Sequence, residues 1–533
     1  MTETTYDYVV VGAGSAGCVM ARRLSEQKAT QVLLLEAGRP DDKREIQIPI
    51  LLFDLFRTEV DWAYSTEPQS GMHGREMSWP RGKTLGGCSS INAMVHVRGH
   101  PSDYDQWASL GNEGWEYAEV LPFFKKSENF SEEDADSQLH ASEGPLHVTD
   151  PRSPRDLSQT FVEAAVRAGY QHNADFNGRH QEGFGLFHLT QKNGRRQSVA
   201  DAYLKPALDR SNLTVETGAH TRQILFDGDR AVGVRYGREG QSVRANAAEE
   251  VILCGGTINS PQLLMLSGIG PADHLREHEI SVQQRLPGVG QNLQDHLTAY
   301  VVYKATKGET LDDADSVTRL PLNLAQFYLF GRGPLTSNIA EAAGFIRTEK
   351  DLPAPDLEVF TAPAHPTSHR FDNPEGIRGF SFAPVCMRPE SRGRISLRSA
   401  DPFEAPAIDP QYLTESVDLE KLVEGIRRSR EIASTPPLDE HLGEEIWPGG
   451  NVESDEALSE YIRERGNSVY HPVGTCRMGD SERAVVDERL RVHGTEGLRV
   501  VDASVMPTIV GGHTNAPTVM ITEKAADMIK DEG

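Results

Sequence analysis

Three glycines and one acid near the start of the chain have the types and spacing that hold a dinucleotide. Gly12, Gly14 and Gly17 follow the pattern GxGxxG, and Glu36 comes nineteen residues after Gly17. Such glycines allow a tight turn, close approach of the backbone to a pyrophosphate and close packing of the next helix. The helix N-terminus attracts the anion, and the carboxylate can hold ribose hydroxyls. The spacing therefore predicts a site for an adenine dinucleotide.

Buried parallel strands and helices must position this turn. Residues 8–11 form a mostly β-branched apolar run before the glycines, and the apolar run 32–35 ends at Glu36. Far downstream, residues 250–254 (EVILC) repeat the pattern and lead through Gly255 and Gly256 to a predicted helix over 260–267. Glycine turns at strand ends are typical of a nucleotide-binding sheet. We expect the sheet begun at the N-terminus to be completed by this distant segment.

The rest of the chain divides into strands, a region of different character and a final helix. The alternating stretch 213–236 turns at Asp227-Gly228, which predicts a hairpin. Residues 300–460 are rich in Arg and Pro and predict a mainly antiparallel substrate domain with some helices. Near the end, Thr514 and Asn515 suit an N-cap and Pro517 suits a first helical turn.

Composition excludes several classes of protein. The 533 residues carry a formal net charge of −25, which argues against nucleic acid as a partner. No run of about eighteen apolar residues could span a membrane, and no signal-peptide pattern precedes the first strand, so we expect a cytoplasmic protein. Two explanations of the acidity remain open, an ordinary acidic enzyme and adaptation to high salt. Five scattered cysteines without CxxC predict neither a disulfide framework nor a metal site.

One histidine stands where general-base chemistry would need it. His471 lies in the loop YHPVGT, and its unperturbed pKa near neutrality suits a proton acceptor. Taken alone, however, one histidine among eighteen is more often structural. Asp295 and His296, in LPGVGQNLQDH, are also candidates from their residue types.

Four segments together resemble the glucose–methanol–choline (GMC) oxidoreductases, flavoenzymes that oxidise alcohols. The first is the glycine turn with Glu36, and the second is WPRGKTLGGCSSINAMVHVRG at 79–99. The third is GGTINSPQLLMLSGIG at 255–270. The fourth combines YHPVGTCRMG at 470–479 with VVDASVMP and GGHTNAPTVM at 500–520. Within that family, the sequence most resembles the branch of choline-dehydrogenase-like and aliphatic-alcohol dehydrogenases.

The resemblance implies a fold, a cofactor and a set of contacts. The fold class is α/β (α+β overall), with a discontinuous Rossmann-like FAD-binding domain at 1–155, 190–300 and 462–533. A mainly antiparallel-sheet substrate domain with helices takes 156–189 and 301–461. The resemblance implies FAD contacts at Gly12, Gly14, Ser15, Gly17, Glu36, Ala37, Trp62, Arg81, Gly86, Gly87, Ser90, Asn92, Ala93, Met94, Val95, Thr221, Asp502, Ala503, Asn515, Pro517 and Thr518. Some relatives attach FAD to a histidine where this chain has Ile91, so we expect non-covalent FAD.

Catalytic roles also come from the resemblance. His471 matches the family's base, and His513 falls where relatives carry the second polar group on the substrate oxygen. Asn515 is a rival for that second role, although the spacing favours His513, with Asn515 capping the helix beneath the flavin. Asp295 and His296 are interpreted as structural, because the family uses their loop to connect domains.

The implied reaction oxidises an alcohol to an aldehyde or ketone, with proton removal by His471 and hydride transfer to flavin N5. A quinone-type acceptor or oxygen would take the electrons, and we expect a dehydrogenase. Two alternatives remain open: a hydroxynitrile-lyase-like enzyme on the same FAD scaffold, and an NAD-dependent dehydrogenase. The second of these leaves the segments around Gly86 and Gly255 unexplained. Oligomeric state cannot be predicted from the sequence.

Overall fold

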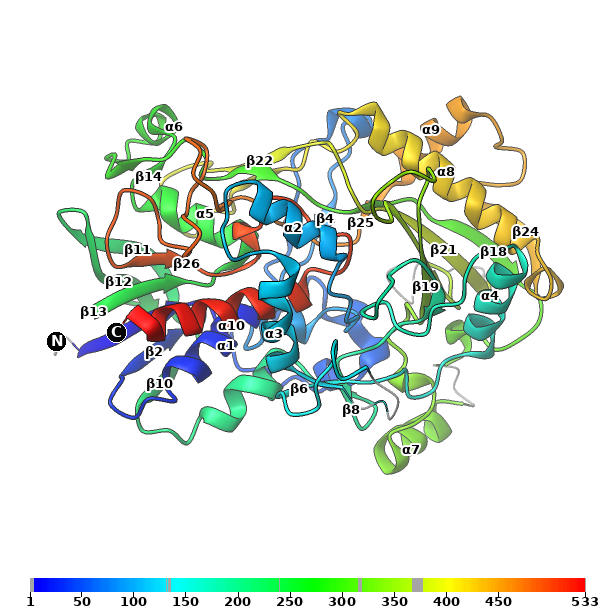
Figure 1. Cartoon of the computed structure of the whole chain (residues 1–533), viewed down its shortest axis with the longest axis horizontal. Coiled ribbons are helices and arrows are strands. Elements are labelled where there is room, and N and C mark those ends of the chain that lie inside the picture. The colour runs from blue at the N-terminus through cyan, green and yellow to red at the C-terminus, as the bar shows by residue number, and fades with distance from the viewer. Residues whose placement is uncertain are drawn as a thin grey trace.

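Two sheets, each with its own helices, build the molecule. The computed structural model describes residues 4–130, 132, 136–238, 240–314, 319–366 and 377–532. Figure 1 shows one sheet beside the two chain ends and the second at the opposite end of the long axis. Within the described ranges, no helix has the length and apolar character to cross a membrane.

The first sheet is a nucleotide-binding sheet assembled from distant segments. Its parallel part runs in the order β10, β2, β1, β13 and β26, and antiparallel β12 and β11 extend it beyond β13. Val9 and Val10 are fully buried, as a strand covered on both faces requires. The strands are β1 (Thr4–Val11), β2 (Val32–Leu35), β10 (Leu213–Glu216), β11 (His220–Asp227), β12 (Arg230–Arg238), β13 (Gln241–Leu253) and β26 (Leu498–Val500).

Helices from the two ends of the chain pack together on this sheet. The helix α1 (Ser15–Leu24) follows the glycine turn, and α10 (Asn515–Glu532) lies along it (Figure 1). An ion pair of 2.7 Å between Arg23 and the fully buried Glu523 joins them. The helix α3 (Tyr117–Ser127) also packs on α10.

The second sheet is antiparallel and carries the middle of the chain. Its order is β24, β18, β21, β20, β19 and β7, and β17 and β25 attach beside β21. The helices α8 (Ser416–Ala433) and α4 (Asp156–Arg167) pack against it. The strands are β7 (Gly183–Leu186), β17 (Leu297–Thr298), β18 (Val301–Ala305), β19 (Ala342–Ile346), β20 (Leu357–Ala362), β21 (Gly379–Cys386), β24 (Leu442–Trp447) and β25 (Asn467–Ser468).

The remaining helices and strands lie outside the two main sheets and the helices named above. They are α2 (Pro101–Ser109), α5 (Gly256–Leu266), α6 (Ala272–Glu277), α7 (Leu320–Phe330), α9 (Asp455–Arg465), β3 (Tyr64–Ser65), β4 (Ser78–Trp79), β5 (Glu128–Phe130), β6 (Leu146–Val148), β8 (Gln191–Lys192), β9 (Arg195–Arg196), β14 (Ile269–Gly270), β15 (Gln284–Arg285), β16 (Gln291–Leu293), β22 (Gly393–Ser396) and β23 (Ala407–Asp409).

The predicted fold class is confirmed, and two details differ from the sequence-based expectation. The helix expected over 260–267 begins at Gly256, because Asp502 accepts a hydrogen bond from the Gly256 amide at 2.8 Å and caps the earlier turn. Strands β17 and β25 belong to the second sheet, although they lie outside the predicted substrate segments 156–189 and 301–461. The domain boundaries themselves stay a prediction.

Candidate active site

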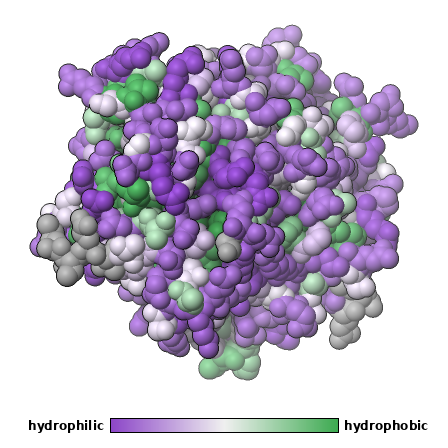
Figure 2. All heavy atoms as spheres, turned by 60° about the vertical axis from the view of Figure 1, so that its left-hand side comes forward, coloured by the Kyte–Doolittle hydropathy of each residue, from purple (hydrophilic) through white to green (hydrophobic). Residues whose placement is uncertain are grey.

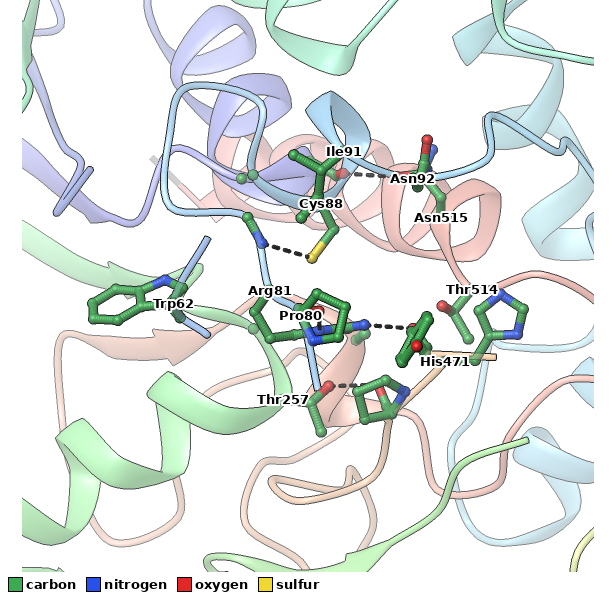
Figure 3. A pocket seen from close by; sticks show the side chains of 18 of the residues that line it. Trp62, Pro80, Arg81, Cys88, Ile91, Asn92, Thr257, His471, Thr514 and Asn515 are labelled. Carbon is green, nitrogen blue, oxygen red and sulfur yellow. Dashed lines mark hydrogen bonds between the residues drawn. The ribbon is translucent and has the colours of Figure 1, made fainter. Parts of the chain in front are cut away.

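A cavity of about 420 Å³ lies between the two sheets. The ends of β1, β2 and β13 supply one wall, and Phe360 and Ala362 of β20 line it from the second sheet. The loop around His471 and the loop before α10 close it (Figure 3). The carboxyl ends of parallel strands are where open α/β sheets bind ligands, so the cavity lies where the glycine turn predicted it.

The glycine turn has the backbone geometry that its sequence predicts. Gly12 has φ +99°, and a side chain there would clash with the Cys254 carbonyl. A Cβ on Gly17 would lie 1.8 Å from the Gly12 carbonyl oxygen, so only glycine lets α1 pack this closely on the turn. No side chain caps the start of α1 at Gly14 among the described residues, which leaves its first amides for an anion.

The acid after β2 is held in place by the same turn. The two carboxylate oxygens of Glu36 accept the amides of Ala13 and Gly38, each at 2.8 Å. Burial raises its pKa to about 7, against the effect of these two hydrogen bonds. Each oxygen keeps a further lone pair, so a hydroxyl donor such as a ribose can still bind there.

The run 86–95 supplies a part of the cavity wall that begins beside the glycine turn. Gly87 packs against the turn, because a Cβ on Gly87 would lie 2.7 Å from the Cα of Gly14. Asn92 accepts the Met94 amide at 2.9 Å, and the same oxygen accepts a hydrogen bond from Arg196 at 2.9 Å. Met94 takes φ +59°, a left-handed conformation that this Asn92 contact stabilises. Ile91 lines the cavity at the position considered for covalent attachment.

The start of α10 is tied directly to the start of α1. The Ser15 hydroxyl donates to the Asn515 side-chain oxygen at 2.7 Å, which brings two helix N-termini to one cavity wall (Figure 3). The Asp502 carboxylate also has its partners within the protein, because it accepts hydrogen bonds from the amides of Gly256 and Ser504 and from the Ser260 hydroxyl. Both side chains therefore shape the cavity through protein contacts.

Most predicted cofactor contacts line this cavity. Four do not, and they shape the turns behind its wall: Gly17, Gly86, Ser90 and Pro517. Ser90, for example, donates its hydroxyl to the Leu85 carbonyl at 2.7 Å. The predicted residues that do line it are Gly12, Gly14, Ser15, Glu36, Ala37, Trp62, Arg81, Gly87, Asn92, Ala93, Met94, Val95, Thr221, Asp502, Ala503, Asn515 and Thr518, together with His471 and His513.

The two predicted catalytic histidines meet in the cavity. Their ring centroids are 4.7 Å apart, with an angle of 70° between the ring planes. His471 follows β25, and His513 precedes α10, so the second sheet and the last helix each contribute one ring. Figure 3 shows Arg81 beside this point, where it donates to the Tyr470 carbonyl at 2.7 Å.

His296 fixes the protonation pattern of His471. Nε2 of His296 lies 3.1 Å from the Met387 carbonyl oxygen, which can only accept, so Nε2 carries the hydrogen. Nδ1 of His296 is then an acceptor, and it lies 3.0 Å from Nδ1 of His471. His471 must therefore donate from Nδ1, which leaves Nε2 as the nitrogen with a free lone pair.

Asp295 and His296, interpreted above as structural, contact His471 directly. Besides the His296 contact, Asp295 accepts the His471 amide at 2.7 Å. It also accepts hydrogen bonds from the hydroxyls of Tyr412 and Ser468. The loop that carries these residues runs into β17, which pairs with β25 just before His471. This pairing, invisible in the sequence, brings both side chains to His471.

Burial sets the titration of this cluster. It lowers the pKa of His471 well below its ordinary range, and the neighbouring His513, His296 and Arg81 lower it further. Burial, followed by the charge of His513, lowers the pKa of His296 to about 3. Both imidazoles are consequently neutral at physiological pH, and His471 can accept a proton.

Glu358 is a functional candidate that sequence reasoning missed. Its side chain, on β20, is 1% exposed and places Oε1 3.1 Å from Nε2 of His513. The sequence signal was a single acid inside an otherwise apolar strand, LEVFTA. A buried carboxylate in such a place needs a partner, and only the folded chain shows that the partner is His513.

Family models described as GMC oxidoreductase match residues 6–298 and 389–522. The chain belongs to this family. The mitochondrial choline dehydrogenase of Mus musculus is 45% identical, over 98% of this chain and 89% of its own length. The alcohol dehydrogenase [acceptor] of Pseudomonas putida is 43% identical, over 98% of this chain and 95% of its own.

Solved structures show the same fold. A variant of Aspergillus oryzae formate oxidase, studied for the effect of mutation on FAD modification, superposes with a TM-score of 0.93 and 28% identity. The match covers 100% of this chain and 99% of the other. GMC membership and this neighbour imply FAD as the cofactor.

The residues present fit FAD. The cavity joins the glycine turn and Glu36 at one end to the histidine pair at the other, as an elongated dinucleotide requires. Thr221 supports the fit, because its buried hydroxyl lines the cavity and has no hydrogen-bond partner among the described residues. A buried polar atom without a partner is unfavourable unless a ligand satisfies it.

Proposed function

We propose that this enzyme oxidises an uncharged primary alcohol to its aldehyde, using non-covalent FAD and an electron acceptor such as a quinone. The observation that carries this proposal is the chain of contacts from Met387 through His296 to His471. It presents a neutral imidazole nitrogen to the cavity. Ile91 supports non-covalent FAD, because its side chain offers no nucleophile for attachment.

The proton step belongs to His471. Nε2 accepts the hydroxyl proton of the alcohol, while Nδ1 keeps its hydrogen bond to His296. The backbone contact to Asp295 keeps the ring in position throughout. General-base catalysis of this kind contributes roughly 10²–10⁴-fold to rate. Bound FAD supplies the acceptor for the hydride that leaves the alcohol carbon.

His513 stabilises the negative charge that develops on the substrate oxygen. Since its Nε2 lies against Glu358, Nδ1 is the nitrogen left for the substrate. Nδ1 can donate a hydrogen bond to that oxygen while Nε2 donates to the Glu358 carboxylate, when both ring nitrogens carry a hydrogen. Asn515 is the weaker candidate for this role, because its side-chain oxygen already binds Ser15.

The lining of the cavity supports an uncharged substrate. It includes the apolar and aromatic residues Tyr300, Ile339, Ala340, Phe360 and Val469. A quaternary ammonium substrate such as choline would call for an aromatic cage together with a carboxylate near the cation. Among the described residues, the acids that line the cavity are Glu36 and Asp502. Glu36 lies at the glycine turn, and Asp502 is bound to the start of α5 through the Gly256 amide and the Ser260 hydroxyl.

Anaerobic spectroscopy tests the proposal. The purified enzyme should be yellow, and primary alcohols should bleach it faster than choline does. Air should restore the colour slowly and a quinone quickly. Protein without flavin absorbance would contradict the proposal. Flavin that no alcohol reduces, in an enzyme that cleaves a cyanohydrin, would favour the hydroxynitrile-lyase alternative.

A further inference from the structure

The helix α7 exposes an unusual amount of apolar surface. Among the residues the structure describes, ten large hydrophobic side chains are exposed, and five of them lie on this one helix. The most exposed are Leu322 (61%), Leu329 (73%) and Phe330 (68%), with Tyr328 and Leu324 beside them. Figure 1 places α7 at the lower edge of the molecule, where Figure 2 shows apolar side chains below a mostly hydrophilic surface.

One face of α7 anchors it to the molecule. Phe327 is buried with Ile48 and Leu335, and Asn323 donates to the Ala314 carbonyl at 2.7 Å. The exposed residues flank these two positions and continue to the C-terminal end of the helix. The helix LPLNLAQFYLF is thus apolar on its buried and on its exposed sides, whereas an ordinary surface helix is polar toward the solvent.

Three cations lie at the C-terminal end of this apolar surface, although the protein as a whole is strongly acidic. The Arg195 guanidinium lies 5.6 Å and 5.7 Å from the ring centres of Phe327 and Tyr328. Lys192 lies in the same β8–β9 hairpin as Arg195, and this hairpin packs on Gly331 at the C-terminal end of α7. Arg332 is the next residue after Gly331. These three cations are exposed, and none forms an ion pair with a described residue.

We propose that α7 is a membrane-docking helix that lies in the interface of a bilayer containing anionic lipids. Apolar and aromatic side chains flanked by Arg and Lys are the composition of helices that bind in this plane. The charges near α7 argue against a second copy of this chain as the binding partner of the helix. A two-fold contact through this face would bring the same cations of the two copies together, and two chains that each carry a net charge of −25 repel one another.

The docking helix is connected to the wall of the active-site cavity. Ile50 and Leu51 pack against the cluster beneath α7, and they belong to the 3₁₀ helix Pro49–Leu55. Leu52 and Phe53 of the same short helix line the cavity. One element thus separates the proposed membrane surface from the site.

Vesicle flotation tests the proposal with the full-length holoenzyme. The wild type should float with phosphatidylglycerol-containing vesicles and much less with pure phosphatidylcholine, and added salt should weaken binding. The double variant Leu329→Glu/Phe330→Glu should bind at least about tenfold more weakly. Arg195→Glu/Arg332→Glu should lose the preference for anionic lipid.

The matched control is Leu110→Glu/Leu208→Glu, which changes two leucines that are each 47% exposed outside α7. It should bind vesicles like the wild type, and thermal unfolding should show that all variants are folded. Wild type that binds no vesicle would overturn the proposal. Unchanged binding by the α7 variant would also overturn it. If the wild type binds no vesicles but forms an oligomer that dissociates in the α7 variant, the partner of α7 is a second copy of the chain and not a membrane.

Discussion

Nδ1 of His296 lies 3.0 Å from Nδ1 of His471, and this contact joins a fully buried imidazole to one that lines the cavity. Because His296 is itself oriented by the Met387 carbonyl, the hydrogen must come from His471. One backbone oxygen therefore decides, through two rings, which nitrogen of His471 meets the substrate.

Loss of the orienting ring should impair catalysis more than binding. In His296→Phe the ring shape remains but the acceptor for His471 is gone, so His471 can adopt the wrong tautomer. We expect kcat to fall by about 10- to 100-fold, as for other partners that orient functional histidines. KM should change little. Steady-state kinetics at saturating acceptor measure both, and an unchanged kcat would refute the orienting role.

Removal of the proposed base itself should have the largest effect. His471→Ala should lower the rate of anaerobic flavin reduction by roughly 10²–10⁴-fold, because no other group accepts the hydroxyl proton. Flavin content should stay at the wild-type level. His274→Ala, at a half-buried histidine that does not line the cavity, is the control and should react normally. If flavin reduction in His471→Ala stayed within twofold of the wild-type rate, another residue would have to accept the hydroxyl proton.

The buried Glu358 should matter through its charge. Glu358→Gln keeps the shape and a hydrogen-bond acceptor but removes the negative charge opposite His513. We expect kcat to fall by at least about tenfold, because a charge-assisted hydrogen bond is replaced by a neutral one. The pH dependence should change as well. Stopped-flow reduction across pH 5–9 measures both.

A matched variant separates this effect from general destabilisation. Glu341 is a second fully buried carboxylate in the same part of the molecule, where it binds the Arg155 amide and the hydroxyls of Ser158 and Ser337. Glu341→Gln should lower thermal stability but leave the pH profile of the enzyme unchanged. Equal kinetic effects of the two variants would argue against a role of Glu358 in the reaction.

The pH profile should reflect the buried base. Burial lowers the pKa of His471, so the neutral, proton-accepting form persists below the ordinary histidine value of about 6.5. kcat/KM should therefore be flat through neutral pH and fall only on the acid side of about 6.5 as His471 becomes protonated. Measurements from pH 4.5 to 9 test this. An acid limb centred above 7 would contradict the assignment.

The flavin should be released when the enzyme is denatured. Ile91 provides no attachment point, so acid precipitation should leave the yellow colour in the supernatant and a colourless pellet. Absorbance near the flavin maximum measures the partition. A yellow pellet would mean a covalent bond to another side chain that lines the cavity.

The sequence by itself determined the local features. Gly12, Gly14 and Gly17 predicted the turn because backbone sterics act within a few residues. The strand before them, the distant strand ending at Leu253 and the hairpin at Asp227-Gly228 followed from short-range patterns of apolar residues and turn residues. Motifs in the family's order then indicated His471 and His513 without any knowledge of their surroundings.

Only the tertiary structure decided how those two rings are supported. His296 and His471 are 175 residues apart, and Glu358 and His513 are 155 apart. Neither pair follows from local spacing, because the register of β17 against β25 and the place of β20 in the second sheet bring them together. Side-chain partners across such distances depend on how the sheets pack, and that packing is a property of the whole chain.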